Sequence, residues 1–188
     1  MGRSRFQSLL LHTALMAVLT CLLASADGHA RDAPERRIDW SDLRPAGQGR
    51  DNPVFPGMAA SRAEGETLTE ELANMPVRIE GYVLPVDREE DLVYEFLLVP
   101  WLGACSHAPQ PPPNQMVHVI PSTPFRIAKA YDFVSVSGTL RPAVEKTQLF
   151  IMDGPAVLTS GYGIGRAEVE HGTPPEPRAG NPWTFMER

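Results

Sequence analysis

From residue 77 onward, apolar and polar side chains alternate with a period of two in one run after another. The clearest run is VRIEGYVLPVD at residues 77–87. Successive side chains of a strand point to opposite faces of a sheet, so this period favours strands over helices. Three further runs of strand-forming residues, and two less regular ones, predict five or six strands in all: 91–101, 115–121, 132–142, 148–158 and 165–172.

The connections between these runs have hairpin length, which predicts a mainly β, antiparallel domain. Gly81 and Gly138 lie inside predicted strands, where glycine marks a bend or a close backbone approach. We therefore predict a small, closed, OB-like barrel (the oligonucleotide/oligosaccharide-binding type), with a β-sandwich as the alternative. The stretch FRIAKAY at 125–131 would form a helical turn between the third and fourth strands.

A short helix is predicted ahead of the first strand, in GETLTEELANMP. Thr67 or Thr69 would cap its start, and Pro76 follows its end. A loop is predicted at SGYGIGRAE, because its three glycines favour turns, and Tyr162 in that loop would cover a site.

Composition divides the chain into four parts. Residues 1–26 combine arginines, an apolar run and Ala-Ser-Ala, the pattern of a secretory signal peptide that directs export to the periplasm. A lipid anchor at Cys21 is not expected, because the apolar run continues past that residue. Residues 27–63 form an irregular N-terminal arm, 64–173 a single β-rich domain, and 174–188 a C-terminal tail.

The N-terminal arm is rich in proline, glycine, arginine and aspartate, but IDWSDL provides three apolar side chains. Ile38, Trp40 and Leu43 could dock the arm on the domain. Full disorder of the arm is the alternative. The tail would be held by Trp183 and Phe185.

The charge balance limits the classes of partner. The chain has 17 basic and 23 acidic residues and a net charge of −6; removing 1–26 takes away two arginines and leaves −8. Such a surface does not attract phosphate backbones or anionic membranes, so nucleic acid is not expected as a partner. Beyond the leader, no apolar run is long enough to span a membrane, so we do not expect an integral membrane protein after signal removal.

The stretch GACSHAPQPPPNQ contains the most chemically distinctive residues. Cys105 is the only cysteine after the leader, so it has no disulfide partner in the chain. Cys105 and His107 are two residues apart and would lie on one side of an extended segment. Thiolate and imidazole are ligands for zinc or copper(I), so we predict a metal site, zinc before copper, with His118 as a third ligand.

Spacing alone does not choose the remaining donors. His118 competes with four other side chains: His171, Asp132, Glu168 and Glu170. In a second interpretation Cys105 is simply packed and His107 bonds a backbone carbonyl. In a third, a thiol enzyme, His118 would be the base, but nothing marks the group that would orient it. We therefore predict a binding protein and not an enzyme.

The proline run offers another function. Extended, proline-rich segments are common docking strips, and the predicted binding loop comprises Pro109, Pro111, Pro112, Pro113, Asn114 and Gln115. In the alternative structural role, Asn114 and Gln115 bond the loop's own backbone groups. A non-catalytic module that docks a transporter through this loop is the alternative function.

The chain resembles a family of bacterial exported proteins defined only as a domain of unknown function, number 3299. The resemblance covers about residues 75–141 and rests on EFLLVPWLGACSHAPQPPPNQMVHV. The family motif falls on Gly103, Ala104, Cys105, His107, Pro109, Pro111, Pro112, Pro113, Asn114 and Gln115; Gln110 departs from it. The resemblance implies an accessory role in metal-uptake systems that include ABC-type transporters, most often for zinc.

Overall fold

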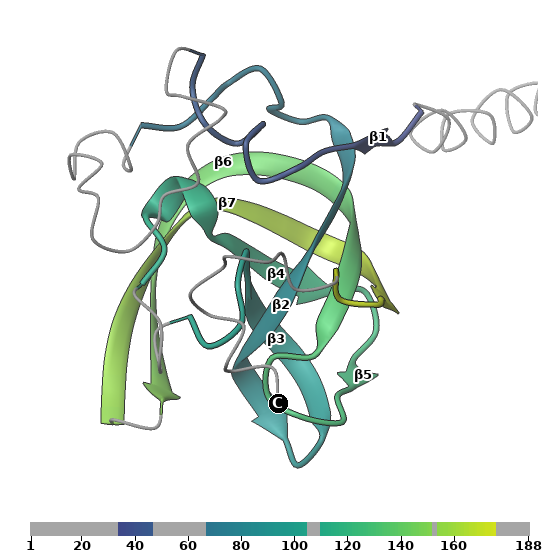
Figure 1. Ribbon diagram of the computed structural model, residues 1–188, viewed down its shortest axis with the longest axis vertical. Coiled ribbons are helices and arrows are strands. Elements are labelled where there is room, and N and C mark those ends of the chain that lie inside the picture. Colours follow the sequence, from purple (N-terminus) through teal and green to yellow (C-terminus); the bar gives the residue numbers. More distant parts are fainter. Residues whose placement is uncertain (1–33, 47–66, 105–109, 152–153, 176–188) are drawn as a thin grey trace, which may run out of the picture. The chain divides into compact units, whose positions relative to one another are not determined.

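A computed structural model describes residues 34–46, 67–104, 110–151 and 154–175 (Figure 1). Those from Glu35 on belong to one compact unit, and Pro34 belongs to a second, N-terminal one. Within the described ranges there are seven strands, one short 3-10 turn and no α-helix. The elements are β1 (Arg36–Arg37), β2 (Pro76–Glu89), β3 (Leu92–Val99), η1 (Pro113–Gln115), β4 (Val117–Pro121), β5 (Phe125–Arg126), β6 (Phe133–Ile151) and β7 (Gly154–His171).

The strands form one sheet whose pairings return to their starting point. β2 pairs antiparallel with both β3 and β6, β6 with β7, and β3 with β4. The circuit is completed by β4 and β7, which run parallel, with Val117 beside Tyr162. The short strand β1 pairs with β2, and the short strand β5 pairs with β3. The predicted mainly β fold is confirmed.

Opposite faces of the same strands supply two cores. In β2, Val77, Ile79 and Val83 face the first core, whereas Tyr82 and Leu84 face the second. This separation follows directly from the period of two in the sequence. The second core consists of Tyr82, Leu84, Leu97, Val99, Ala104, Met116, Leu149 and Leu158.

Leu149 and Leu158 reach the second core from a long hairpin. We call residues 143–151 and 154–161 the β6–β7 arm. Within the described residues this part of β6 pairs only with β7, beyond a bulge between Pro142 and Glu145. Its inner face is buried, but its outer face exposes Val144, Phe150 and Val157 at 65%, 82% and 61%.

Two predicted helical segments are not helical. From Thr67 the chain forms isolated turns, and Asn74 adopts a left-handed φ of 58°. The backbone here bonds to β6 and not to its own preceding turn, as a helix would require. Asn74 N donates to Leu140 O at 2.8 Å, and Leu140 N donates to Met75 O at 3.0 Å. The stretch at 125–131 begins as strand β5, which pairs with β3.

Two strand boundaries were also predicted wrongly. The run at 148–158 contains the end of β6 and the start of β7, which pair antiparallel as far as Ile151 and Gly154. The predicted loop SGYGIGRAE is part of β7, and Tyr162 is fully buried in the first core. It therefore covers no site at the surface.

The predicted docking of the N-terminal arm is confirmed for residues 35–46. Ile38 and Leu43 are buried in the first core, and Trp40 packs against it while its Nε1 donates to Glu80 O at 2.8 Å. The predicted signal peptide, most of the rest of the arm, and Trp183 and Phe185 of the tail lie outside the described residues. No helix in the described ranges is long and apolar enough to cross a membrane.

Candidate functional site

Cys105, His107 and Pro109 lie outside the described residues, but both flanks of their segment are described. On one side Ala104 is fully buried in the second core. Its carbonyl oxygen accepts a hydrogen bond of 2.6 Å from the Tyr131 hydroxyl. On the other side Gln110 is exposed and Pro111 is buried. The stretch that contains Cys105 therefore begins and ends at anchored positions.

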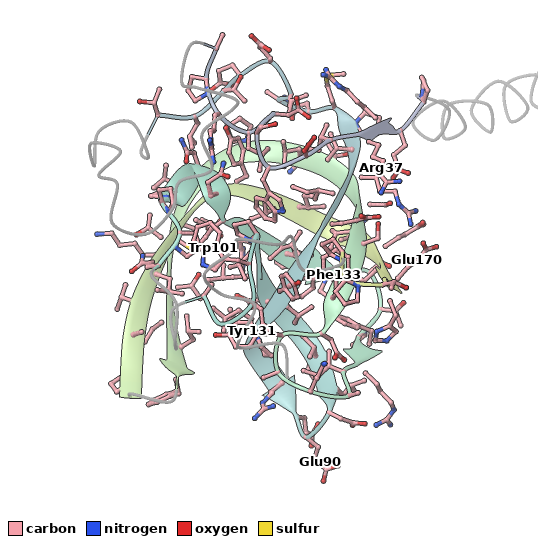
Figure 2. The ribbon with its side chains drawn as sticks, viewed as in Figure 1. Arg37, Glu90, Trp101, Tyr131, Phe133 and Glu170 are labelled. Carbon is pink, nitrogen blue, oxygen red and sulfur yellow. The ribbon has the colours of Figure 1, made fainter. Side chains whose placement is uncertain are left out.

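Tyr131 is itself fixed by the backbone around it. Its φ of 62° is left-handed, which is unusual for a bulky residue. Tyr131 N donates to Val83 O at 3.1 Å, and Val83 N donates to Asp132 O at 2.9 Å. The Asp132 carboxylate in turn accepts from Ala128 N at 2.6 Å. Tyr131 packs against the second core, as Trp101 and Phe133 do; all three are labelled in Figure 2.

The proline run leads into η1, which contains Asn114 and Gln115. The side-chain amides of these two residues point into the protein. Asn114 Nδ2 donates to Thr67 O at 3.2 Å. Gln115 Nε2 donates to Trp40 O at 2.9 Å and to Asn114 O at 2.8 Å. Both side chains are buried, so they stabilise the loop and the N-terminal segment from inside. In the described part of this loop, from Gln110 on, only Gln110, Pro112 and Pro113 are exposed enough to contribute to a docking surface.

His118 lies on the face of β4 that points away from the first core, opposite Leu97 of β3. Its Nε2 is 2.7 Å from Glu95 Oε1, and its Nδ1 is 2.7 Å from Glu145 Oε2. The imidazole is only 12% exposed, against 34% and 50% for the two carboxylates. We call these three residues the Glu–His–Glu clasp. It joins β3, β4 and the β6–β7 arm.

The clasp is too tight to contain a zinc ion. Zinc lies about 2.0–2.2 Å from nitrogen and oxygen ligands, so two ligands of one tetrahedral ion are about 3.4 Å apart. The nitrogen–oxygen distances at His118 are 2.7 Å, so neither pair leaves room for an ion between its atoms. Both ring nitrogens are engaged, and the imidazole is not available as a metal ligand in this arrangement.

The other predicted donors are not gathered around His118. Glu170 binds Arg78 at 2.7 Å, and this hydrogen bond raises the pKa of the guanidinium. His171 packs edge-on against the Phe125 ring. Across the described part of the chain, no group of three or more His, Cys, Asp or Glu side chains is arranged to hold a metal ion.

Sequence reasoning missed Glu95, Tyr131 and Glu145. The alternation in β3 and β4 does place Glu95 and His118 on the face that also carries Leu97 of the second core, so the contact between Glu95 and His118 could have been predicted. The contact of Glu145 could not, because its position depends on the bulge in β6. Tyr131 acts through a left-handed backbone conformation that its residue type does not indicate.

Comparison with known proteins gives a consistent result. The sequence profile described as "Protein of unknown function (DUF3299)" matches residues 40–171. The crystal structure of a DUF3299 family protein from Pseudomonas aeruginosa PAO1 is similar, with a TM-score of 0.58 and 26% sequence identity. The alignment covers 76% of this chain and 99% of that chain. No protein with a curated description matches.

Proposed function

The chain belongs to the DUF3299 family, and from that premise we propose that it is an exported, non-catalytic accessory protein that binds a transition metal through Cys105 and His107. Zinc is the first candidate and copper the second, because thiolate and imidazole suit both ions. The observation that carries the proposal is the anchoring of the flanks at Ala104 and Pro111. Fixed flanks lower the entropy that is lost when two ligands are brought to one ion.

Two protein ligands suit transfer of a metal better than storage. Structural zinc sites have four protein ligands, whereas a Cys–His pair leaves positions for water or for donors of a partner. The partner we propose is a component of an ABC-type transporter for metal uptake. Export to the periplasm is supported by the signal-peptide pattern in residues 1–26.

The circuit of β2, β3, β4, β7 and β6 supports an OB-like barrel as the fold that presents this segment. One parallel pair, β4 with β7, closes otherwise antiparallel neighbours, as expected for a five-stranded Greek-key barrel. Ala104 follows β3 and Pro111 precedes β4, so the segment connects two adjacent strands of this circuit. The alternative function, docking through the proline loop, is less well supported because Pro111, Asn114 and Gln115 are buried.

The proposal is tested by metal titration of tag-free protein without residues 1–26. We expect one zinc per chain for the wild type, and Cys105→Ser and His107→Ala to weaken binding by about tenfold or more. His118→Asn is the matched control and should bind zinc as the wild type does, because its ring is engaged by carboxylates. Equal zinc affinity of wild type and Cys105→Ser, or no binding of zinc or copper(I) by either, would contradict the proposal.

A thiol enzyme remains the competing class, and alkylation of Cys105 separates it from a metal ligand. Rapid reaction with iodoacetamide at mildly acidic pH would indicate an activated thiolate. A metal-binding cysteine without such activation should react slowly there, and more slowly still after zinc is added.

A further inference from the structure

We infer that the Glu–His–Glu clasp is a pH-sensitive latch that fastens the β6–β7 arm to the second core. The inference does not depend on metal binding. It rests on three strands that meet at one ring: β3 brings Glu95, β4 brings His118, and the arm brings Glu145. It also rests on the burial of the ring, of which only 12% is exposed.

The geometry determines which form of the ring can hold both contacts. A carboxylate only accepts hydrogen bonds, and a neutral imidazole has one donor and one acceptor nitrogen. Both nitrogens of His118 lie 2.7 Å from a carboxylate oxygen, so both must donate for both contacts to be favourable. Only the doubly protonated ring does this. In the neutral ring, one nitrogen lone pair would face a carboxylate oxygen and that contact would be repulsive.

In the described part of the chain, one other charge lies on this face of the sheet: Arg141 of β6 pairs with Gly163, as His118 does from the other side, and Arg141 is exposed. The two neighbours of β4 in the sheet are β3, which supplies Glu95, and β7, which places Gly163 beside His118. η1, just before β4, contains no titratable residue. The arm supplies Glu145, and the next residue, Lys146, is exposed. Among the described residues, the two glutamates are the only partners of the ring in ion pairs.

Glu145 is well placed to control the arm. It follows the bulge that begins the arm, and it pairs with Ser160 across the hairpin. From this point outward the described arm pairs with no other strand, so its position depends on Leu149 and Leu158 in the second core and on the clasp. If Glu145 releases His118, the arm keeps its apolar contacts with the domain and, at its base, the hydrogen bond of 3.3 Å from Gly161 N to Met116 O. Leu97 and Met116 of the second core would then become accessible.

The direction of the switch follows from the charges. The latch is closed while the ring is protonated and the glutamates are ionised. It opens at higher pH, when the ring loses its second proton, because one nitrogen lone pair then faces a carboxylate oxygen. In a compartment exposed to outside pH, such a latch would make the second core more accessible at higher pH than at lower pH.

Hydrogen exchange of the complete mature chain between pH 5 and pH 9 tests this. The readout is the protection of arm amides, corrected for intrinsic exchange and divided by the protection of Val77–Ile79 in β2. We expect the ratio to fall by about tenfold as pH rises, the factor that corresponds to one hydrogen bond to a charged group. His118→Gln, which retains a donor but does not titrate, should show a ratio that does not change with pH.

Two further variants keep the test decisive. His171→Gln removes a histidine that makes no ion pair among the described residues, and it should keep the pH dependence of the wild type. If His118→Gln does not fold, Glu145→Ala, which removes the hydrogen-bonding group of the arm altogether, should give a low ratio at every pH. A wild-type ratio that is constant from pH 5 to pH 9 would overturn the inference. The same pH dependence in wild type and either clasp variant would also overturn it.

Discussion

The hydroxyl oxygen of Tyr162 lies 2.8 Å from the carbonyl oxygen of Leu43, which is 119 positions earlier in the chain. The same oxygen accepts a hydrogen bond of 2.7 Å from Thr69 N. Tyr162 is fully buried in the first core, together with Leu43. One phenol therefore joins β7 to the N-terminal segment and to the turns that precede β2.

Replacing Tyr162 by phenylalanine should destabilise the protein while leaving the core filled. The change leaves Thr69 N and Leu43 O without this partner, and a buried unsatisfied group costs about 1–3 kcal/mol. Urea unfolding followed by tryptophan fluorescence measures the loss. Tyr94→Phe is the control: its hydroxyl reaches Glu89 only at 3.5 Å and its ring is 36% exposed, so stability should stay unchanged. Equal stability of both variants would contradict the assigned role of Tyr162.

Tyr162 should also make the protein sensitive to alkali. Burial is the main cause that raises the pKa of Tyr162 from the ordinary 10.0 to about 12; the hydrogen bond from Thr69 N acts against it, and the nearby charge of Glu70 adds a smaller upward contribution. In the unfolded chain the phenol ionises near pH 10, so the stabilisation is complete below pH 10 and is lost as pH rises towards 12. The loss should reach about 2 kcal/mol in the wild type. Tyr162→Phe should lack this component, as measured by the difference between the two stability curves from pH 9 to pH 12.

The strands were predictable from the sequence because alternation is a local property. The bounds of β2, β3 and β4 agree with predicted runs to within a few residues. The agreement arises because the two faces of each strand meet different surroundings, which the alternation of side chains records. The parallel pairing of β4 with β7 was not predictable, because it depends on contacts between distant segments. The same limit applies to the clasp: nothing local to His118 indicates that Glu145 will reach it.

The error at Tyr162 has a specific cause. Gly161, Gly163 and Gly165 suggested a loop, because glycine is common in turns. In β7 Gly161 instead permits a close approach of η1 and Leu68, which a side chain would prevent. Composition could not distinguish these two uses of glycine, and they lead to opposite predictions for Tyr162.

Gln115 offers a test of the amide network beneath the proline run. Gln115→Met keeps the length of the side chain but removes the donor to Trp40 O and Asn114 O. We expect a loss of about 1–3 kcal/mol, since Gln115 is only 1% exposed and the change leaves two backbone carbonyls without its amide donor and Arg44 Nη2 without Oε1, which it reaches at 3.4 Å. Gln110→Met, at an exposed position of the same loop, should have little effect on urea unfolding. A harmless Gln115→Met would mean that water replaces the amide, and that the loop is less firmly anchored than we argue.

Two glycines of β7 should respond to alanine with opposite signs. A Cβ at Gly161 would lie 2.4 Å from Leu68 Cδ2 and 2.7 Å from Pro113 O, and the second of these is backbone that cannot easily move. Gly161→Ala should therefore destabilise by about 1–3 kcal/mol, as overpacking does. At Gly165 a Cβ meets nothing within 4 Å, so Gly165→Ala should be neutral or stabilising by up to about 1 kcal/mol, because alanine restricts the unfolded chain. Urea midpoints of the two variants, compared with wild type, decide the matter. Equal losses of stability in both variants would contradict this prediction. The close approach of η1 to β7 would then not explain why position 161 is a glycine.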